Sequence, residues 1–504
     1  MIAVVQFDAV SVPLVERMLA EGRLPTLAGL RDRGQWFELE TPATHFPAGT
    51  YATLYSGRRV ADHGMYYAFQ WVPDEQRVRW RETFESPSAV WDRVASAGRR
   101  ALVIDPYETT PPQASAGVTV SGWQFVNVMS LNRWSVPGSA HRNLARTLGR
   151  PRRMEEVFGR PSVRGMRSLR RLLQIATERV VGAASLLLRQ ESFDLAWVNF
   201  LAAHLAGHMF WDLSQIDVAR LDAPTRTAFE HTLTDVYAQI DHGIGRIAAA
   251  LPDDADIVIT SPMGMGTNVS RVDFLPAMLE SVLAANGSNL TRAESRGERF
   301  IWRLRGSIPT TVRGKVAAAL HGPLTREATM RLSSIGVDWH RTPAFLLPSD
   351  HFGQVRLNVR GRERDGIVDP GEVDALIERI RSGLLSYRDS DGAASVVAVD
   401  RARDVVGEGE RVDMLPDLVV RWSERSASDL RCVTSLQFGE VRRAGAGSGR
   451  SGSHLPQAWA LVVPGRSAEA KRGQASVLDL APTVCAALGV NEDELPGAPF
   501  LLGR

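Results

Sequence analysis

The stretch IAVVQFD, residues 2–8, is a short and mostly apolar run that ends in a carboxylate. Continuous apolar runs of this length are typical of strands that are buried on both faces of a parallel sheet. Comparable runs follow at residues 100–104, 195–200 and 257–260, and amphipathic stretches separate them. The alternation predicts a mostly parallel α/β sheet, in which the polar residues at the strand ends gather along one edge.

The amphipathic stretches predict helices, because their apolar residues recur three or four positions apart. The spacing is clearest between Leu233 and Ile247, within a helix predicted at residues 225–250. Further helices are predicted at residues 12–20, 24–32 and 89–96, and further strands at residues 418–422 and 459–463.

The composition is typical of a globular enzyme rather than of a nucleic-acid or membrane protein. Of the 504 residues, 44% are hydrophobic and 23% charged, and the net charge of +2 does not favour nucleic acid. No run approaches the roughly 18 consecutive apolar residues of a membrane span, and the first residues lack the basic segment of a signal peptide. The two cysteines, Cys432 and Cys485, fit a reducing compartment. We therefore expect a cytoplasmic protein without a membrane span, long enough for several structural units.

Two regions interrupt the α/β pattern and are predicted to be insertions at the active-site end of the sheet. The first region, residues 139–190, is helical and rich in arginine. These arginines form either a solvated helical face or a surface that binds an anionic substrate or a membrane. Aromatic residues are not interleaved with these arginines, which counts against nucleic acid. The predicted division is 1–138 for the N-terminal part of the core, 139–190 for the basic helical insertion, 191–267 for a core segment with a histidine-rich helix, 268–345 for a cap-like insertion, and 346–504 for the C-terminal part of the core.

Histidines occur at metal-ligand spacing in AHLAGHMFW, residues 203–211. His204 and His208 are four residues apart, so a helix would carry both imidazoles on one face. His454 lies in a Gly-Ser-His segment, and Asp8 ends the first predicted strand. Imidazole and carboxylate groups are common ligands of Zn²⁺ in proteins, so these four residues are candidate metal ligands.

A series of short motifs runs through nearly the whole chain. They are EGRLPTL at 21–27, SGRRVADHG at 56–64, WDRVASAG at 91–98, AHLAGHMFW at 203–211, RLNVRGRE at 356–363, LPDL at 415–418 and DLAPT at 479–483. In this order the chain resembles the type I phosphodiesterase and nucleotide pyrophosphatase branch of the alkaline phosphatase superfamily. The resemblance implies an alkaline-phosphatase-like three-layer α/β sandwich with a mostly parallel central sheet and inserted cap regions.

Members of this family bind two zinc-like ions, one beside the nucleophile and one beside the leaving group. The resemblance implies that His204, His208 and His454 form one site, although the first of these positions is more often Asp in the family. Asp8 and residues 262 and 263 would form the site beside the nucleophile. In this chain the latter two are Pro262-Met263, and neither a proline side chain nor a soft thioether suits zinc. One bound Zn²⁺ is therefore expected, and the site beside the nucleophile is expected to lack a tightly held ion.

The family places its nucleophilic Thr or Ser at a helix start, shortly before the glycine of the motif at 56–64. Three alternatives stay open here: Thr44, Thr50, or neither. Alignment on Phe46-Pro47 places His45 at this position, and His45 is also a candidate general base. The pair Asp350-His351 mimics the missing Asp-His pair, but it lies elsewhere in the chain, and we interpret it as a coincidence.

Two classes of function fit these residues. The first is a metal-dependent hydrolase of phosphate esters, diesters included, or of sulfate esters of a small organic molecule. A close variant transfers the phosphoryl or sulfuryl group to another acceptor instead of water. The second is a non-catalytic member of the family that binds an anionic ligand, which the Pro262-Met263 replacement favours. The three histidines favour the enzyme, and metal content would distinguish the two classes.

Overall fold

The N-terminal apolar run forms β1 (Ile2–Phe7), whose six residues are all buried at the centre of a nine-stranded sheet. In the computed structural model β1 pairs in parallel with β8 (Leu195–Phe200) on one side and β9 (Asp256–Ser261) on the other. The register places Phe7 opposite Phe200 and Gln6 opposite Thr260, so these three strands end at the same edge. The structure describes residues 1–127, 131–154, 160–284, 330, 337–349, 351–443, 447–465, 469–470 and 474–502.

The remaining strands extend the sheet on both sides of this parallel centre. The order is β21 (Ala475–Ser476), β2 (Gln35–Glu40), β19 (Ala458–Val463), β9, β1, β8, β5 (Ala101–Ile104), β6 (Gly117–Ser121) and β7 (Trp134–Val136). Antiparallel pairs occur around β19 and at β7, and the other pairs are parallel. The predicted mostly parallel sheet is therefore confirmed.

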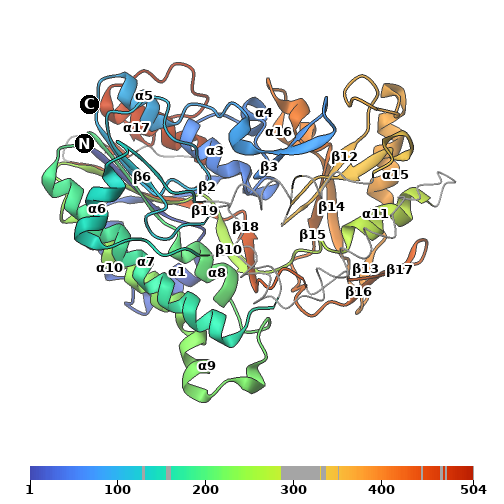
Figure 1. Ribbon diagram of the computed structural model, residues 1–504, viewed down its shortest axis with the longest axis horizontal. Helices are drawn as coiled ribbons and strands as arrows, with labels where there is room; N and C mark the ends of the chain where they lie inside the picture. Colours follow the sequence, from blue (N-terminus) through green and yellow to red (C-terminus); the bar gives the residue numbers. More distant parts are fainter. Residues whose placement is uncertain are drawn as a thin grey trace.

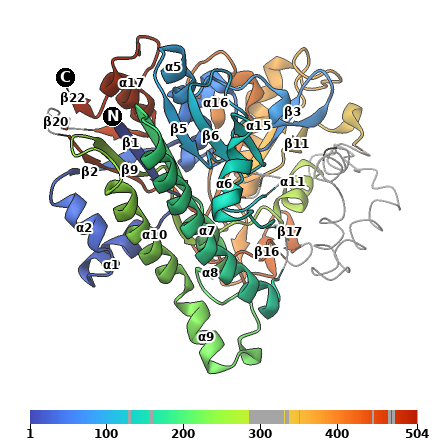
Figure 2. The same ribbon diagram turned by 60° about the vertical axis from the view of Figure 1, so that its left-hand side comes forward.

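Helices cover both faces of this sheet, which gives three layers (Figures 1 and 2). Alternate side chains of β1 pack in different clusters, with Ala3, Val5 and Phe7 on one face and Ile2 and Val4 on the other. The first face carries α1 (Val12–Ala20), α2 (Pro25–Arg31), α7 (Val163–Gln190), α8 (Ala202–Phe210) and α10 (Thr232–Ala248). The second carries α3 (Gly49–Ser56), α5 (Val90–Ser96) and α17 (Leu480–Leu488). This is the three-layer sandwich that the sequence predicts.

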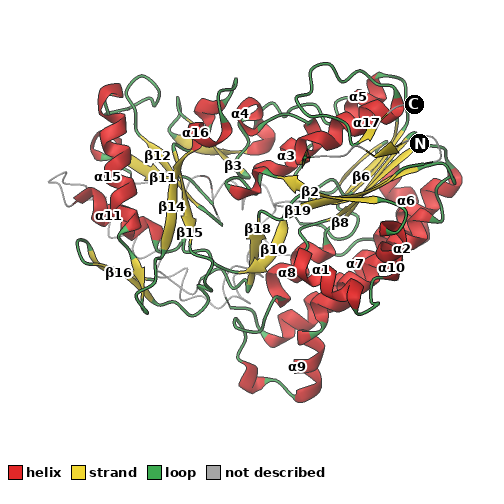
Figure 3. Ribbon diagram, turned by 180° about the vertical axis from the view of Figure 1, so that it is seen from behind, coloured by secondary structure: helices red, strands yellow, loops and turns green. Residues whose placement is uncertain are grey.

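A smaller lobe with its own apolar core lies beside the sandwich (Figures 1 and 3). Its sheet is antiparallel and has the order β11 (Ala344–Leu346), β12 (Gly353–Leu357), β15 (Leu418–Trp422) and β14 (Val396–Arg401). It also contains α11 (Leu275–Ala284), α15 (Val373–Leu385), and β13 (Arg388–Asp389), β16 (Cys432–Ser435) and β17 (Gly439–Arg442). Residues 346–504 are thus divided between this lobe and the sandwich, whereas the sequence division keeps them in one part of the core.

Two helical regions differ from the sequence-based expectation. The helix expected at 225–250 is broken at His231 into α9 (Ala223–Glu230) and α10. The basic region 139–190 contains α6 (Ala140–Leu148) and α7. Helix α7 lies in the helical layer beside α10, because the apolar stripe of α7 packs into the main core (Figure 2).

Of the region 268–345, residues 285–329 and 331–336 lie outside the described part of the chain. No helix among the described residues has the length and apolar character needed to cross a membrane.

Candidate metal centre

Three histidines from two distant segments meet at the edge of the sheet where the parallel strands end. His204 and His208 lie on α8, which follows the end of β8 directly. His454 lies on β18 (Gly452–Leu455), a short strand that pairs with β10 (Gly264–Thr267) between the two lobes (Figure 1). One possible ligand atom from each histidine lies within 4.8 Å of the others. The structure therefore brings these three predicted ligands together.

Two glycines allow α8 and the β10–β18 ribbon to approach so closely. A Cβ atom at Gly452 would lie 2.1 Å from the carbonyl oxygen of Gly207, and a Cβ at Gly207 would lie 2.6 Å from Cγ of Met265. Both distances are shorter than a real contact of a Cβ atom. A side chain at Gly452 would meet backbone and push the helix and the ribbon apart, and one at Gly207 would displace the side chain of Met265. Met265 is paired with His454 across the ribbon, so this close packing sets how near His454 comes to α8.

Hydrogen bonds determine which ring nitrogens carry protons. His208 Nδ1 lies 2.9 Å from the Gly452 carbonyl oxygen, which can only accept, so Nδ1 of His208 is the donor. His204 Nδ1 lies 2.7 Å from a carboxylate oxygen of Asp8 and donates to it in the same way. The two Nε2 atoms face each other at 3.1 Å. Either one of them carries a proton that it donates to the other, or both lone pairs point at a bound cation, and two imidazole nitrogens in this arrangement suit a metal ion.

The surroundings keep the imidazoles of His208 and His454 neutral, which is the form that binds metal. Burial lowers the pKa of His208 and of His454 well below the ordinary value, and the neighbouring Arg450 and histidines lower both further. Nδ1 of His454 is also buried and has no hydrogen-bond partner within the described ranges. Three imidazoles, one of them with a ring nitrogen that has no partner, fit Zn²⁺, and three protein ligands with an open fourth position are the pattern of catalytic zinc sites.

Asp8 is buried at the end of β1 and accepts three hydrogen bonds. Gln6 Nε2 donates at 2.7 Å, the Tyr51 hydroxyl donates at 2.9 Å, and His204 Nδ1 donates at 2.7 Å. Burial and the charge of Asp8 raise the pKa of Tyr51 well above its ordinary value, so the phenol keeps its proton. A carboxylate that holds the Nδ1 proton of a histidine orients the other nitrogen toward a metal. The structure thus places Asp8 behind His204, while its predicted role as a direct ligand stays a prediction.

The segment after β9 holds Pro262 and Met263, and both are engaged in contacts other than metal binding. The register of β1 and β9 brings Pro262 beside Asp8 at the strand ends. The Pro262 carbonyl accepts a 2.7 Å hydrogen bond from Thr41, and the Met263 side chain is fully buried in the apolar cluster beneath α3. Within the described residues, His204, His208 and His454 are the only group of three or more possible ligands that come together.

The candidate nucleophiles differ in their environment. Thr50 lies in the first turn of α3, is fully buried, and donates its hydroxyl proton to the Phe46 carbonyl at 3.2 Å. Thr44 ends the short 3₁₀ helix η1 (Pro42–Thr44), is half-buried, and donates to the Thr41 carbonyl at 3.3 Å. This short helix packs against β18, which carries His454. Thr44 is therefore the more accessible of the two hydroxyls.

His45 forms a hydrogen bond to a carboxylate that sequence reasoning did not find. Its Nε2 lies 3.1 Å from a carboxylate oxygen of Asp400 on β14, and Arg421 Nε on β15 donates to the same oxygen at 2.6 Å. Because the carboxylate accepts, Nε2 carries the proton and the lone pair of Nδ1 is available. Burial lowers the pKa of His45, and the hydrogen bond to Asp400 opposes that shift. Asp400 follows His45 by 355 residues, and no local pattern signals their contact.

His351 also comes to the metal centre. Its ring is buried, its centroid lies 6.0 Å from that of His454, and its Nδ1 is hydrogen-bonded to Ser453 Oγ. The pair Asp350-His351, interpreted from the sequence as a coincidence, therefore places its histidine next to a candidate ligand. Asp350 itself lies outside the described residues.

The sequence matches the model of the family described as type I phosphodiesterase / nucleotide pyrophosphatase over residues 2–428. The chain belongs to this family, which confirms the resemblance and places the protein among phosphodiesterase-type hydrolases. No curated protein matches the sequence.

The solved structures that are similar to this chain have low sequence identity to it. A phosphonoacetate hydrolase from Sinorhizobium meliloti 1021 in complex with phosphonoformate is 15% identical, with a TM-score of 0.48, over 97% of this chain and 95% of that chain. Murine ectonucleotide pyrophosphatase / phosphodiesterase 5, in an inactive variant bound to AMP, is 10% identical, with a TM-score of 0.49, over 99% and 97%. The human protein of that name is 10% identical, with a TM-score of 0.46, over the whole of both chains.

Proposed function

We propose that this protein hydrolyses phosphate esters of a small organic molecule with a single bound Zn²⁺. The observation that carries the metal is the pair of Nε2 atoms of His204 and His208, 3.1 Å apart, with both Nδ1 atoms engaged as donors. The reaction class rests on the family to which the chain belongs. His204, His208 and His454 would hold the ion, which as a Lewis acid would supply positive charge to an ester oxygen.

Thr44 is the proposed nucleophile and His45 its base. The Thr44 oxygen attacks phosphorus while its proton passes to Nδ1 of His45, and the bond from phosphorus to the leaving oxygen breaks. The leaving oxygen then takes that proton from His45. Water next attacks the phosphothreonine and gives a proton to Nδ1, the bond from phosphorus to Thr44 breaks, and the proton returns to Thr44. Asp400 supports both steps because it holds Nε2–H and stabilises the positive imidazolium.

Hydrogen-bond donors take the place of a second ion around Asp8. A buried carboxylate is unfavourable unless cations or donors compensate its charge. Here Gln6, Tyr51 and His204 together supply three donors. This environment supports an enzyme with one metal, since Asp8 needs no further cation to be stable and the neighbouring Pro262-Met263 offers no hard ligand.

Elemental analysis of the purified protein, together with turnover of aryl phosphodiester, phosphate monoester and sulfate ester substrates, tests the proposal. His208→Ala removes one ligand, and His242→Ala, an exposed histidine on α10, is the matched control. We expect one zinc per chain in the wild type and in the control. We expect His208→Ala to lose both zinc and turnover of the phosphate esters.

Two outcomes would contradict the proposal in different ways. Zinc without turnover of any phosphate ester, or preferential turnover of the sulfate, would leave the metal site intact and change the substrate class. Absence of both zinc and turnover would favour the non-catalytic alternative, in which the site binds an anionic ligand without cleaving it.

A further inference from the structure

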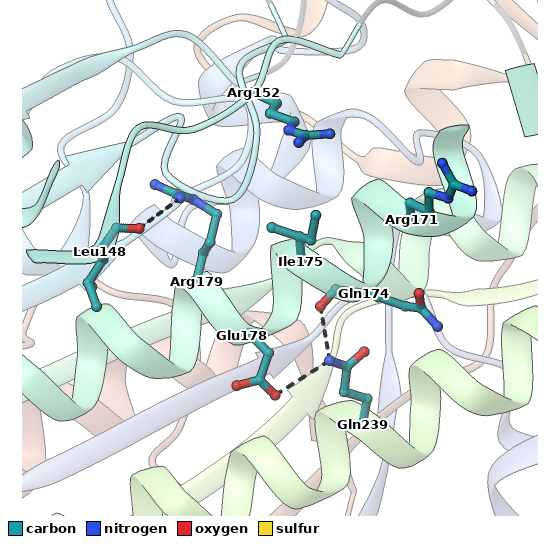
Figure 4. Close-up of a pocket in the computed structure, with 8 residues that line it drawn as sticks. All are labelled: Leu148, Arg152, Arg171, Gln174, Ile175, Glu178, Arg179 and Gln239. Atoms are coloured by element: carbon teal, nitrogen blue, oxygen red, sulfur yellow. Dashed lines mark hydrogen bonds between the residues drawn. The ribbon is translucent and has the colours of Figure 1, made fainter. Parts of the chain in front are cut away.

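A cavity lies away from the three histidines, on the outer side of the helical layer. It has a volume of about 640 Å³ and is bordered by α7, α10 and the segment after α6 (Figure 4). That volume is within the range of about 300–1,000 Å³ that is typical of small-molecule sites. None of the residues of the metal centre lines it, so the proposed hydrolysis gives it no role.

One wall of this cavity is a fixed guanidinium group. Arg179 donates to the carbonyl oxygens of Leu148 at 3.2 Å, Gly149 at 2.8 Å and Trp123 at 2.9 Å, and it lies 4.3 Å above the Trp123 ring. All of these partners are neutral. The side chain is therefore held in place by neutral groups, and the charge of the buried Asp105 acts on it without a direct ion pair among the described residues.

Two further arginines extend into the cavity from its rim. Arg152 and Arg171 are exposed, and neither has an ion-pair partner within the described ranges. Figure 4 shows both guanidinium groups on the same side of Ile175. The single acidic residue of the lining, Glu178, is paired with Arg246 at 2.8 Å and is also hydrogen-bonded by Gln239. The lining thus has three positive charges against one negative charge that is already compensated.

The floor between the arginines is apolar. Ile175 is 39% exposed, on a helix that otherwise buries its apolar stripe. A ligand that fits this cavity therefore carries negative charge toward the rim and an organic part toward Ile175. Guanidinium groups bind phosphate oxygens in a bidentate manner, and two exposed arginines beside a fixed one suit a group with several anionic oxygens.

We propose that this cavity is a binding site for a phosphate group, held by Arg152 and Arg171 with Arg179 as a fixed positive wall. The group could be carried by a free phosphate compound or by the headgroup of an anionic phospholipid, since both present the same oxygens. The cavity is larger than phosphate alone requires, and Ile175 would contact the organic part in either case. The site is independent of the metal centre and of the proposed hydrolysis.

Two binding measurements on the full-length protein distinguish these sources. Calorimetric titration with inorganic phosphate and with glycerol 3-phosphate tests free compounds. Cosedimentation with phosphatidylcholine vesicles, with and without phosphatidic acid, tests the headgroup. The double variant Arg152→Ala/Arg171→Ala removes the two arginines, and Ile175→Glu places a negative charge on the floor. Arg379→Ala is the matched control, because Arg379 on α15 of the other lobe is exposed and has no ion-pair partner among the described residues.

Because charge-assisted hydrogen bonds at an exposed site are involved, we expect the double variant to weaken phosphate binding at this site about tenfold or more. Ile175→Glu should weaken it as well, the control should bind as the wild type does, and hydrolysis should be unchanged in all variants. A phosphate site at the metal centre would persist in every variant. If the double variant loses binding of inorganic phosphate and glycerol 3-phosphate, the ligand is a soluble phosphate compound. If it loses binding to vesicles that contain phosphatidic acid, the ligand is a lipid headgroup. If all variants bind as the wild type does in both measurements, the proposal is overturned.

Discussion

Asp8→Asn tests how the metal centre is organised. Asn keeps the shape of the side chain and one acceptor for His204 Nδ1–H. It removes the negative charge of the carboxylate, which now accepts three hydrogen bonds. Hydrogen bonds to charged groups contribute about 1.5–3 kcal/mol, and the bond between His204 and Asp8 is short and fully buried. If that contribution orients His204 toward the metal, its loss corresponds to an increase of about 10–100-fold in the Kd for zinc.

The assay is competition for zinc between the protein and a chromophoric chelator, with stoichiometry measured on the same samples. Tyr51→Phe is the matched control, because it removes a donor to Asp8 and leaves the bond between His204 and Asp8 in place. We expect one zinc per chain in all three proteins, with a much smaller change in Kd for Tyr51→Phe. A fall from two ions to one in Asp8→Asn would show that Asp8 is a direct ligand of a second ion. An unchanged Kd would refute the orienting role.

Further predictions concern the base, the close packing and the acid stability. Asp400→Asn should lower the pKa of His45 further, because the hydrogen bond to Asp400 raises that pKa. In a pH profile of kcat/KM, the acidic limb should therefore move to lower pH, and kcat should fall by about 10²-fold. Gly452→Ala should weaken zinc binding without altering a ligand and cost about 1–3 kcal/mol of stability, measured by denaturant unfolding, whereas Gly371→Ala, at an open site, should do neither. Burial lowers the pKa of His63 from 6.5 to about 3, so the unfolded chain binds more protons between these values and stability rises with pH. Unfolding free energy should therefore decrease by roughly 4 kcal/mol on acidification through this window, and His63→Gln should abolish that component.

The sequence predicts the sandwich well because its central strands are continuous apolar runs. IAVVQF is buried on both faces in β1, and the runs at β8 and β9 pair with it in parallel. The smaller lobe was harder to separate from the core, because its sheet is assembled from strands that also read as short apolar runs. Only the pairing shows that β15 belongs beside β12 and β14 rather than in the central sheet.

The candidate site was predictable where spacing within one element carries the information. His204 and His208 follow from an i, i+4 pattern on a helix, and the structure brings them to His454 as expected. The partners Asp400 and His351 could not be derived in this way. Each comes from the smaller lobe and contacts a residue more than a hundred positions away in the chain, so its place depends on how the two lobes pack.

This origin of the partners implies that the site is completed by both lobes. The sandwich supplies Asp8, His204 and His208 from the ends of its parallel strands, where buried backbone makes their positions rigid. The smaller lobe supplies Asp400, whose hydrogen bond to His45 crosses between the lobes at a half-buried position. The proposed zinc binding would therefore depend on the sandwich and its ribbon, while orientation of the proposed base, His45, would depend on the contact between lobes. A perturbation of that contact should lower turnover while leaving the metal bound, whereas loss of a histidine should remove both.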